Sequence, residues 1–319
     1  MAVGSTVLPI SRLHRYQGCL SGLAAGDAVG TTLEFRPRGS FAPITDMVGG
    51  GPFGLLPGQW TDDTSMALCL AESLLECGGF DAEDQMERYC LWWQRGHLSS
   101  TGLCFDIGST VLTALQRYRK TGNAFAGSEH PRSAGNGSIM RLAPVVLYFS
   151  AGNSMAVDRV RCLLDMAEWS SRTTHGAAEC VDACRYMAWL LHLLLAGQGL
   201  DVVLANRNYQ ARTPAVQALV NGEWRQKTEA DIRGSGYVMA SLEAALWCLD
   251  RYRSFDSAIL AAANLGDDAD TTAAICGQLA GALYGINGIP LRWQQQLCMR
   301  TYLEQQAERL LLEGASAGR

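Results

Sequence analysis

The chain has 319 residues, of which 48% are hydrophobic and 18% are charged, and its formal net charge is -5. This mildly acidic balance argues against nucleic acid as the main partner, and no stretch is long and apolar enough to cross a membrane. The eleven cysteines are scattered without a Cys-x-x-Cys pair or a histidine at zinc spacing. We therefore expect a reduced, cytoplasmic protein without disulfides.

The first predicted element is a helix over residues 12–33, rich in small residues. Glycine recurs at every fourth position from Gly18 to Gly30, which gathers the glycines on one side of the helix. Because a face without side chains lets another backbone approach closely, we expect tight packing there. Glu34 follows as a lone acid before a proline-containing loop, where a solvated position is the ordinary interpretation.

The next helix opens with two neighbouring acids. A loop rich in glycine and proline at 49–58 leads to Trp60-Thr61-Asp62-Asp63-Thr64. Helical periodicity follows at 65–75, 81–93 and 107–118. Thr61 is a candidate N-cap, so Asp62 and Asp63 fall in the first helical turn.

Three further positions bring polar groups to predicted loops or helix starts. Asp106 stands among apolar and glycine residues just before a predicted helix, where it is either a cap or a functional acid. The stretch from Gly135 to Arg141 offers small side chains and backbone N–H groups ahead of a helix start, which suits a diphosphate, although an ordinary turn has the same composition. His175 precedes a predicted helix at 177–195, and a hydrogen-bonded cap is its ordinary role.

The remaining pattern is helical at 158–169, 238–250, 255–264, 272–284 and 297–312. Residues 200–232 are the most polar and least periodic, so we expect them to be partly irregular and exposed. Ala273, Gly277 and Gly281 form a second face of small residues. Strand signals are nearly absent and no linker divides the chain. The predicted fold class is all-α, as a single domain over residues 1–319 with its core at about 12–312.

The strongest functional signal is the run Gly266-Asp267-Asp268-Ala269-Asp270-Thr271. No lysine or arginine lies between Ser257 and Tyr284 to balance these acids. A helix N-terminus favours negative charge by only about 1 kcal/mol, so a divalent cation with oxygen ligands explains the cluster better. With the earlier acidic stretch, the candidate ligands for two cations, roughly 3.5–4 Å apart, are Thr61, Asp62, Asp63, Asp268, Asp270 and Thr271. The alternative is a pair of capped, solvated helix starts.

These two acidic motifs, with Gly-Gln-Leu-Ala-Gly-Ala-Leu-Tyr-Gly ending at Gly285, resemble the ADP-ribosylglycohydrolases. Within that family the sequence looks most like the bacterial dinitrogenase reductase-activating glycohydrolases. The resemblance extends from about Gly18 to Gly285. It implies an all-α single domain with a binuclear Mg²⁺ or Mn²⁺ site that removes ADP-ribose from a protein side chain.

The resemblance also implies roles for single residues. The six candidate ligands named above match the family's metal positions, whereas Asp267 stands where some relatives have glycine and is left out. Glu34 matches a glutamate on a mobile segment near the metals, and Asp106 matches an aspartate near the scissile bond in the arginine-specific branch. We assign proton handling and positioning of the guanidinium group to Asp106, with Glu34 as the alternative. The residues matched to ADP-ribose binding are Gly135, Asn136, Gly137, Ser138, Met140, Arg141, His175 and, more weakly, Tyr237.

Three functions remain open from the sequence. The first is a hydrolase acting on a mono-ADP-ribosylated protein, with arginine favoured over serine as the linkage because of Asp106 and its neighbours. The second is an immunity protein that neutralises an ADP-ribosyltransferase toxin by hydrolysis or by direct binding. Binding would need an added arm, for which residues 1–10 and 200–232 are the candidates. The third is a non-enzymatic relative, against which the intact set of metal ligands counts.

Overall fold

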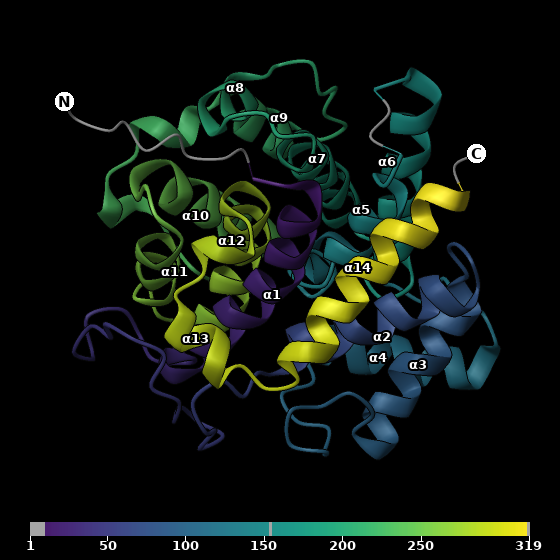
Figure 1. Cartoon of the computed structure of the whole chain (residues 1–319). Helices are drawn as coiled ribbons and strands as arrows, with labels where there is room; N and C mark the ends of the chain where they lie inside the picture. Colours follow the sequence, from purple (N-terminus) through teal and green to yellow (C-terminus); the bar gives the residue numbers. More distant parts are fainter. Residues whose placement is uncertain (1–9, 153–154, 318–319) are drawn as a thin grey trace.

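The centre of the fold is an antiparallel pair of helices, α1 (Arg12–Gly30) and α12 (Ala269–Tyr284), that touch through their backbones (Figure 1). A Cβ atom added to Gly22 would lie 2.4 Å from the Gly277 carbonyl oxygen, and one added to Gly26 would lie 2.2 Å from that of Ala273. The same approach recurs between Gly18 and Gly281. The predicted close packing of both small-residue faces is therefore confirmed, and the two faces are partners of each other.

The computed structural model describes residues 10–152 and 155–317. In these ranges the regular structure is helical, with three isolated β-bridges. The predicted all-α fold class is confirmed. Besides α1 and α12, the α-helices are α2 (Asp62–Glu76), α3 (Ala82–Arg95), α4 (Ser109–Thr121), α5 (Ala143–Phe149), α6 (Val157–Arg172), α7 (Ala178–Leu195), α8 (Leu200–Ala205), α9 (Pro214–Asn221), α10 (Val238–Arg251), α11 (Phe255–Ala263), α13 (Leu291–Gln296) and α14 (Arg300–Ala317). The 3₁₀ helices are η1 (Thr31–Leu33), η2 (Pro131–Ser133), η3 (Glu223–Gln226), η4 (Glu229–Asp231) and η5 (Ile286–Gly288).

The other helices surround this central pair (Figure 1). α10 and α11 pack against α12, while α14 lies across α1, α2 and α5. α3 and α4 sit outside α2 and share a smaller apolar cluster with it, separate from the main core. This arrangement brings the C-terminal end of α1 beside the N-terminal ends of α2 and α12, although these segments lie far apart in the sequence.

The segment 200–232 agrees with the expectation in part. It is partly irregular and many of its residues are exposed, as predicted, but it also contains α8, α9, η3 and η4 and contributes buried side chains. Val216 and Trp224 are fully or almost fully buried, and the Trp224 indole donates to the Leu219 carbonyl. Helices this short give too few turns for a clear hydrophobic period. The short helix α13 was not predicted, for the same reason.

The expectations about cysteines and membranes can be compared with the structure directly. All eleven cysteines lie among the described residues, and each is a free thiol. Within residues 10–152 and 155–317, we find no helix whose length and hydropathy would let it cross a bilayer.

Candidate active site

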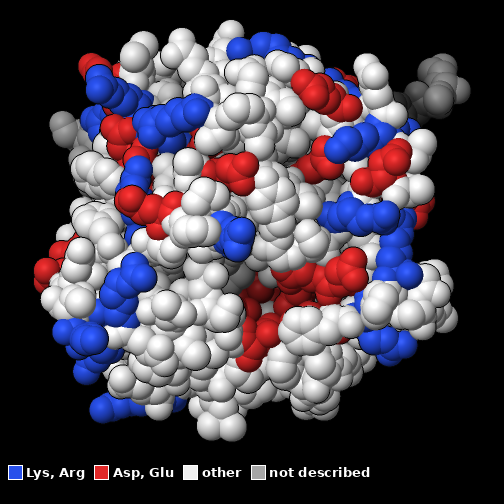
Figure 2. All heavy atoms as spheres, turned by 180° about the vertical axis from the view of Figure 1, so that it is seen from behind, with Lys and Arg blue, Asp and Glu red and all other residues white. Residues whose placement is uncertain are grey.

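Acidic side chains gather in one hollow on the face opposite to that of Figure 1 (Figure 2). The cavity beneath has a volume of about 610 Å³. Its walls come from the N-terminal ends of α2 and α12, the loops before α4 and α7, and the segment after α1. Helix N-termini carry unpaired N–H groups and favour anionic groups, which is consistent with acids collecting where these helices begin.

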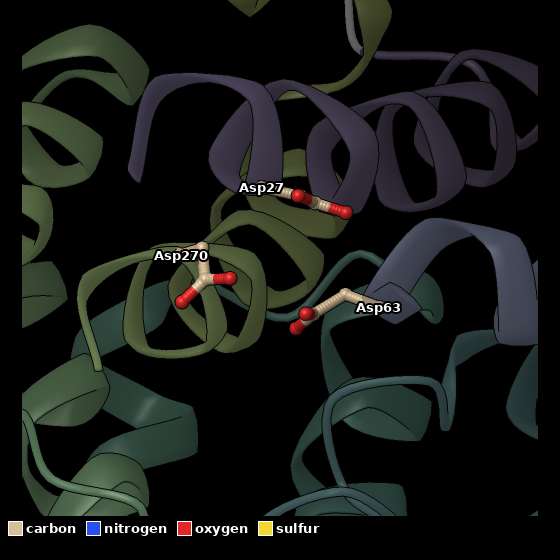
Figure 3. Close-up of side chains that lie close together, drawn as sticks. All are labelled: Asp27, Asp63 and Asp270. Carbon is tan, nitrogen blue, oxygen red and sulfur yellow. The ribbon is translucent and has the colours of Figure 1, made fainter. Parts of the chain in front are cut away.

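Two trios of carboxylates lie in and under this cavity and share one residue. Oxygen atoms of Asp27, Asp63 and Asp270 lie within 4.8 Å of one another, and so do those of Glu34, Asp106 and Asp270. Figure 3 shows the first trio, whose carboxylates come from α1, α2 and α12 and converge on one space. The acidic motifs predicted from sequence to meet in the fold do meet, with Asp270 between the two groups.

Several of these carboxylate oxygens have no hydrogen-bond partner. Oε2 of Glu34, Oδ1 of Asp63 and Oδ1 of Asp270 are buried and unpaired. Burial, followed by repulsion from the neighbouring carboxylates, raises the pKa of Asp63 and of Asp270 well above the usual value. Buried anions require a compensating positive charge. Oxygen atoms without partners, in acid trios that share a residue, are the donor set that Mg²⁺ or Mn²⁺ prefers.

Asp27 belongs to the first trio but differs from the other two acids. Its Oδ1 accepts hydrogen bonds from the backbone N–H of Thr61 at 2.9 Å and the Thr61 hydroxyl at 2.8 Å. Its Oδ2 accepts from the backbone N–H and the hydroxyl of Thr64, at 3.0 and 2.6 Å. Both oxygens are thus occupied by donors. Asp27 therefore caps the start of α2 from a different helix, whereas Oδ1 of Asp63 and Oδ1 of Asp270 have no hydrogen-bond partner.

Thr61 occupies the predicted N-cap position of α2, but its side chain makes no capping hydrogen bond. The hydroxyl instead lies 3.3 Å from Oδ2 of both Asp63 and Asp270, while it donates to Asp27. This geometry leaves the Thr61 oxygen facing the acid trio. The predicted capping role is therefore wrong for the side chain, because Asp27 takes it over.

The other predicted ligands lie at the cavity wall. Asp62 and Thr271 line it, and so does the half-buried Asp268, whose Oδ2 accepts a hydrogen bond from Asn136 at 2.7 Å. Asp267, which was left out of the ligand set, also lines the cavity. Its φ of +56° places it in the left-handed region, which non-glycine residues rarely adopt and which recurs at functional sites.

Glu34 and Asp106 form the outer acidic pair. Burial and the Asp106 carboxylate raise the pKa of Glu34 to about 10, and burial raises the pKa of Asp106 to about 7. Asp106 does not cap α4, whose N-cap is Gly108, and its φ is +57°. A group that titrates near neutral pH can give or take a proton during turnover. The functional interpretation of Asp106 thus fits better than the capping one.

The loop from Gly135 to Arg141 forms another part of the cavity lining, and its Asn136 side chain contacts Asp268. Gly135, Asn136, Gly137 and Met140 line the cavity. A Cβ atom on Gly137 would lie 2.8 Å from Cε1 of His175, so glycine is needed for the loop to approach that ring. Ser138 and Arg141 do not reach the cavity surface. Ser138 is buried and accepts a hydrogen bond from the Ser171 hydroxyl.

Arg141 acts on the cavity through two other residues. It is fully buried, and its Nη2 donates to the Thr174 hydroxyl oxygen at 2.9 Å. That hydroxyl lies 2.8 Å from Nδ1 of His175. Because Thr174 accepts from Arg141, its own hydrogen can point to Nδ1, which leaves the proton of the neutral imidazole on Nε2. Burial and the nearby guanidinium of Arg141 lower the pKa of His175 to about 3. His175 therefore lines the cavity as a neutral N–H donor and does not cap α7, whose N-cap is Ala177.

Tyr237 lies near the acidic cavity, outside its lining. It is the N-cap residue of α10, forms a β-bridge with Gly135, and is 43% exposed. Its hydroxyl donates to Glu179 at 2.7 Å. The ring is placed beside the glycine loop without lining the cavity itself.

Comparison with known proteins identifies the family of this chain. A sequence model described as ADP-ribosylglycohydrolase matches residues 8–319. The chain belongs to the ADP-ribosylglycohydrolase family. The resemblance stated from the motifs is thereby confirmed.

Individual relatives of this ADP-ribosylglycohydrolase cover nearly all of it. It is 44% identical to the ADP-ribosylarginine hydrolase Tri1 of Pseudomonas putida (strain GB-1), over 96% of this chain and 80% of the relative. It is 32% identical to the ADP-ribosyl-[dinitrogen reductase] glycohydrolase of Rhodospirillum rubrum, over 91% and 92%. A solved structure titled ADP-ribosylglycohydrolase-related protein complex superposes with a TM-score of 0.83 at 42% identity, covering 95% of this chain and 99% of that one.

Sequence reasoning missed one residue of this glycohydrolase site, Asp27. A signal was present, because Asp27 is a charged residue in the last turn of the glycine- and alanine-rich helix α1, and the residues around it in that turn are all buried. A buried charge in such a segment is rare unless it is paired. Its partners, Thr61 and Thr64, lie more than thirty residues away, so the sequence alone did not identify them.

Proposed function

We propose that this protein hydrolyses the bond between ADP-ribose and arginine side chains of modified proteins, with two divalent cations in the acidic cavity. The main observation in support is the pair of carboxylate trios that share Asp270 and have unpaired buried oxygens. The likeness to ADP-ribosylarginine hydrolases at 43% and 44% identity supports arginine as the linkage. Thr61, Asp62, Asp63, Asp268, Asp270 and Thr271 would hold the cations, with Glu34 beside them.

The bond to be broken joins ribose C1 to a guanidinium nitrogen. Positive charge develops on the sugar as that bond breaks, as in other glycoside hydrolyses, and a cavity lined with carboxylates stabilises such charge. Two bound cations would supply a positive field that orients the ribose hydroxyls and favours ionisation of the attacking water. Asp106, with its pKa raised to about 7, takes the proton from water or returns it to the departing guanidine nitrogen. Glu34 lies close enough to share that proton.

The diphosphate would bind beside the loop from Gly135 to Arg141. The N–H groups of Gly135 and Asn136 already donate to the carbonyls of Ser133 and Gly236, so the candidate donors are the Gly137 N–H and the Nε2–H of neutral His175. A neutral donor contributes a hydrogen bond that does not change with pH in the physiological range. The Tyr237 ring, exposed beside this loop, offers an apolar surface for the adenine.

An ADP-ribose release assay tests the proposal. The wild-type protein is incubated with arginine-linked and serine-linked ADP-ribosyl proteins, in Mg²⁺, in Mn²⁺ and in EDTA. We expect release from arginine, loss of release in EDTA, and loss in Asp63→Asn. Release that persists at full rate in EDTA would refute the role of the cations. Release from the serine-linked protein alone would refute arginine as the acceptor residue.

A second role is neutralisation of an ADP-ribosyltransferase toxin. Reversal of arginine modification would provide protection by hydrolysis. For direct binding, the candidate arm at 200–232 packs Trp224 into the core, and of the other candidate, residues 1–10, positions 1–9 lie outside the described residues. Protection of cells that express a transferase by wild type but not by Asp63→Asn would support hydrolysis, and equal protection would support binding. The eleven free thiols support our expectation of a cytoplasmic location.

A further inference from the structure

Three phenylalanine rings from separate loops form a row that begins at the lining of the acidic cavity, with Phe35. The ring centroids of Phe35 and Phe53 are 6.4 Å apart, and those of Phe53 and Phe105 are 5.1 Å apart. Phe35 lines the cavity and is 64% exposed, while Phe53 and Phe105 are half-buried. We call this row of rings, Phe35, Phe53 and Phe105, the phenylalanine rim.

The backbone holds the first ring of the rim in an unfavourable conformation. Phe35 has a φ of +59°, a region that bulky L-residues rarely adopt. Two backbone hydrogen bonds fix it there, from Phe35 N–H to the Asp267 carbonyl at 2.7 Å and from Asp267 N–H to the Arg36 carbonyl at 2.8 Å. The Phe35 side chain is largely exposed and its ring contact is with Phe53, so burial in the core does not account for this backbone conformation.

Two of the three rings are neighbours of the acids that face the cavity. Glu34 precedes Phe35 and Asp106 follows Phe105, and both acids line the cavity. At each of these two loops a carboxylate lines the cavity and the residue next to it in the chain carries an aromatic ring of the row. A cationic group lying between the cavity and the solvent would meet carboxylates on one side and aromatic rings on the other.

We propose that the phenylalanine rim binds the guanidinium group of the ADP-ribosylated arginine and so sets the preference for arginine as the acceptor. This inference rests on the proposed function and deepens it. Guanidinium is planar and weakly hydrated, and it stacks on aromatic faces while its edges donate to carboxylates. A serine linkage has neither the charge nor the planar group, so the rim contributes nothing comparable to it. The negative charge of the cavity and the rim's continuity with it favour this occupant over an apolar partner surface.

The test replaces the ring and keeps the apolar bulk. Phe35→Leu and Phe105→Leu are compared with wild type on an arginine-linked ADP-ribosyl peptide, with kcat and KM measured separately. Binding of free ADP-ribose, which has no guanidinium group, is measured on the same variants by calorimetry. Trp169→Leu is the matched control, because Trp169 is an exposed aromatic residue with its own ring partner, Phe80, and lies outside the cavity lining.

We expect each leucine variant to lose roughly threefold to thirtyfold in kcat/KM on the arginine-linked peptide, the range of a single cation–π contact. ADP-ribose affinity should stay within twofold of wild type, and the Trp169 variant should behave as wild type. Unchanged kcat/KM in both rim variants, or an equal loss in ADP-ribose affinity, overturns the inference while leaving the proposed function intact. A wild-type protein that releases no ADP-ribose from arginine overturns both.

Discussion

Replacing Asp27 and Asp63 by asparagine, one at a time, tests whether Asp27 is a structural acid and Asp63 the cation ligand that we propose. The two side chains lie in the same trio with oxygens within 4.8 Å, and both are fully buried. Their hydrogen bonding is opposite. Asp27 accepts four hydrogen bonds, whereas Oδ1 of Asp63 has no partner. The same chemical change should therefore have opposite effects on the metal-free protein.

The magnitude follows from the donors that would lose an acceptor. Asparagine at position 27 keeps one oxygen, which can serve Thr61 or Thr64, while its amide hydrogens face the N–H and hydroxyl of the other threonine. Two hydrogen bonds to a charged acceptor are lost, each worth about 1.5–3 kcal/mol. The loss of one negative charge near Asp63 and Asp270 offsets part of this. We expect Asp27→Asn to lower the free energy of unfolding by about 3 kcal/mol.

Asparagine at position 63 removes a buried carboxylate that nothing compensates in EDTA. Burial, and after it the neighbouring carboxylates, raise the pKa of Asp63 well above the usual value, so the folded protein disfavours the charged form. We therefore expect Asp63→Asn to match or exceed the stability of wild type in EDTA, and to lose the stabilisation that added Mg²⁺ or Mn²⁺ gives wild type. A ligand at one hundred times its dissociation constant stabilises by about 2.7 kcal/mol.

The assay is urea unfolding at neutral pH, in EDTA and with each cation. If Asp27→Asn is as stable as wild type in EDTA, the hydrogen bonds to Thr61 and Thr64 do not support α2 and the interpretation of Asp27 as a cap fails. If Asp63→Asn is as destabilised as Asp27→Asn, the unpaired oxygen is not a source of strain and the case for a cation there is lost.

Three other predictions concern the pH dependence of stability, the packing of α1 against α12, and the orientation of His175. In EDTA the folded protein keeps protons on Glu34 and Asp106, because their pKa values are raised to about 10 and about 7, whereas the unfolded chain releases these protons above about pH 4. The stability of the folded protein should therefore fall from pH 5 to pH 8. A thermal unfolding temperature that rises over this range would contradict the prediction. Gly22→Ala puts a methyl group 2.4 Å from the Gly277 carbonyl oxygen and should lower the free energy of unfolding in urea by about 1–3 kcal/mol. In the control variant Gly199→Ala the new methyl group meets nothing within 4 Å, so stability should change little. Equal effects of the two variants would contradict the close packing of α1 and α12. Thr174→Val removes the hydroxyl beside His175 and should weaken ADP-ribose binding about fivefold by calorimetry, and unchanged affinity would show that the orientation of the imidazole does not depend on Thr174.

The sequence predicted the central elements because their signals are local. Glycine at every fourth position indicated a smooth helix face, and a second such face appeared near the other end of the chain. That these two faces are each other's partner depends on the fold, and no spacing rule supplies it. The two acidic motifs indicated a shared site because carboxylates held close together need a cation to offset their repulsion.

What the sequence did not predict depends on contacts between distant segments. The capping of α2 by Asp27 replaces a local cap that Thr61 could have supplied, and local pattern favours the wrong residue. Arg141 matched a loop that surrounds the substrate, but its side chain turns inward to Thr174, a contact across more than thirty residues. The phenylalanine rim could not be anticipated either, since its three rings come from three loops of irregular structure.

The backbone contact between α1 and α12 has a consequence for the acids that these helices carry. Helices that touch at their main-chain atoms cannot move apart to relieve repulsion between carboxylates at their ends. If the proposed cations bind there, their departure would leave the carboxylates close together, and uptake of hydrogen ions from the solvent would relieve the repulsion. We therefore expect the binding of divalent cations to release hydrogen ions from these carboxylates. Cation affinity should then rise steeply with pH.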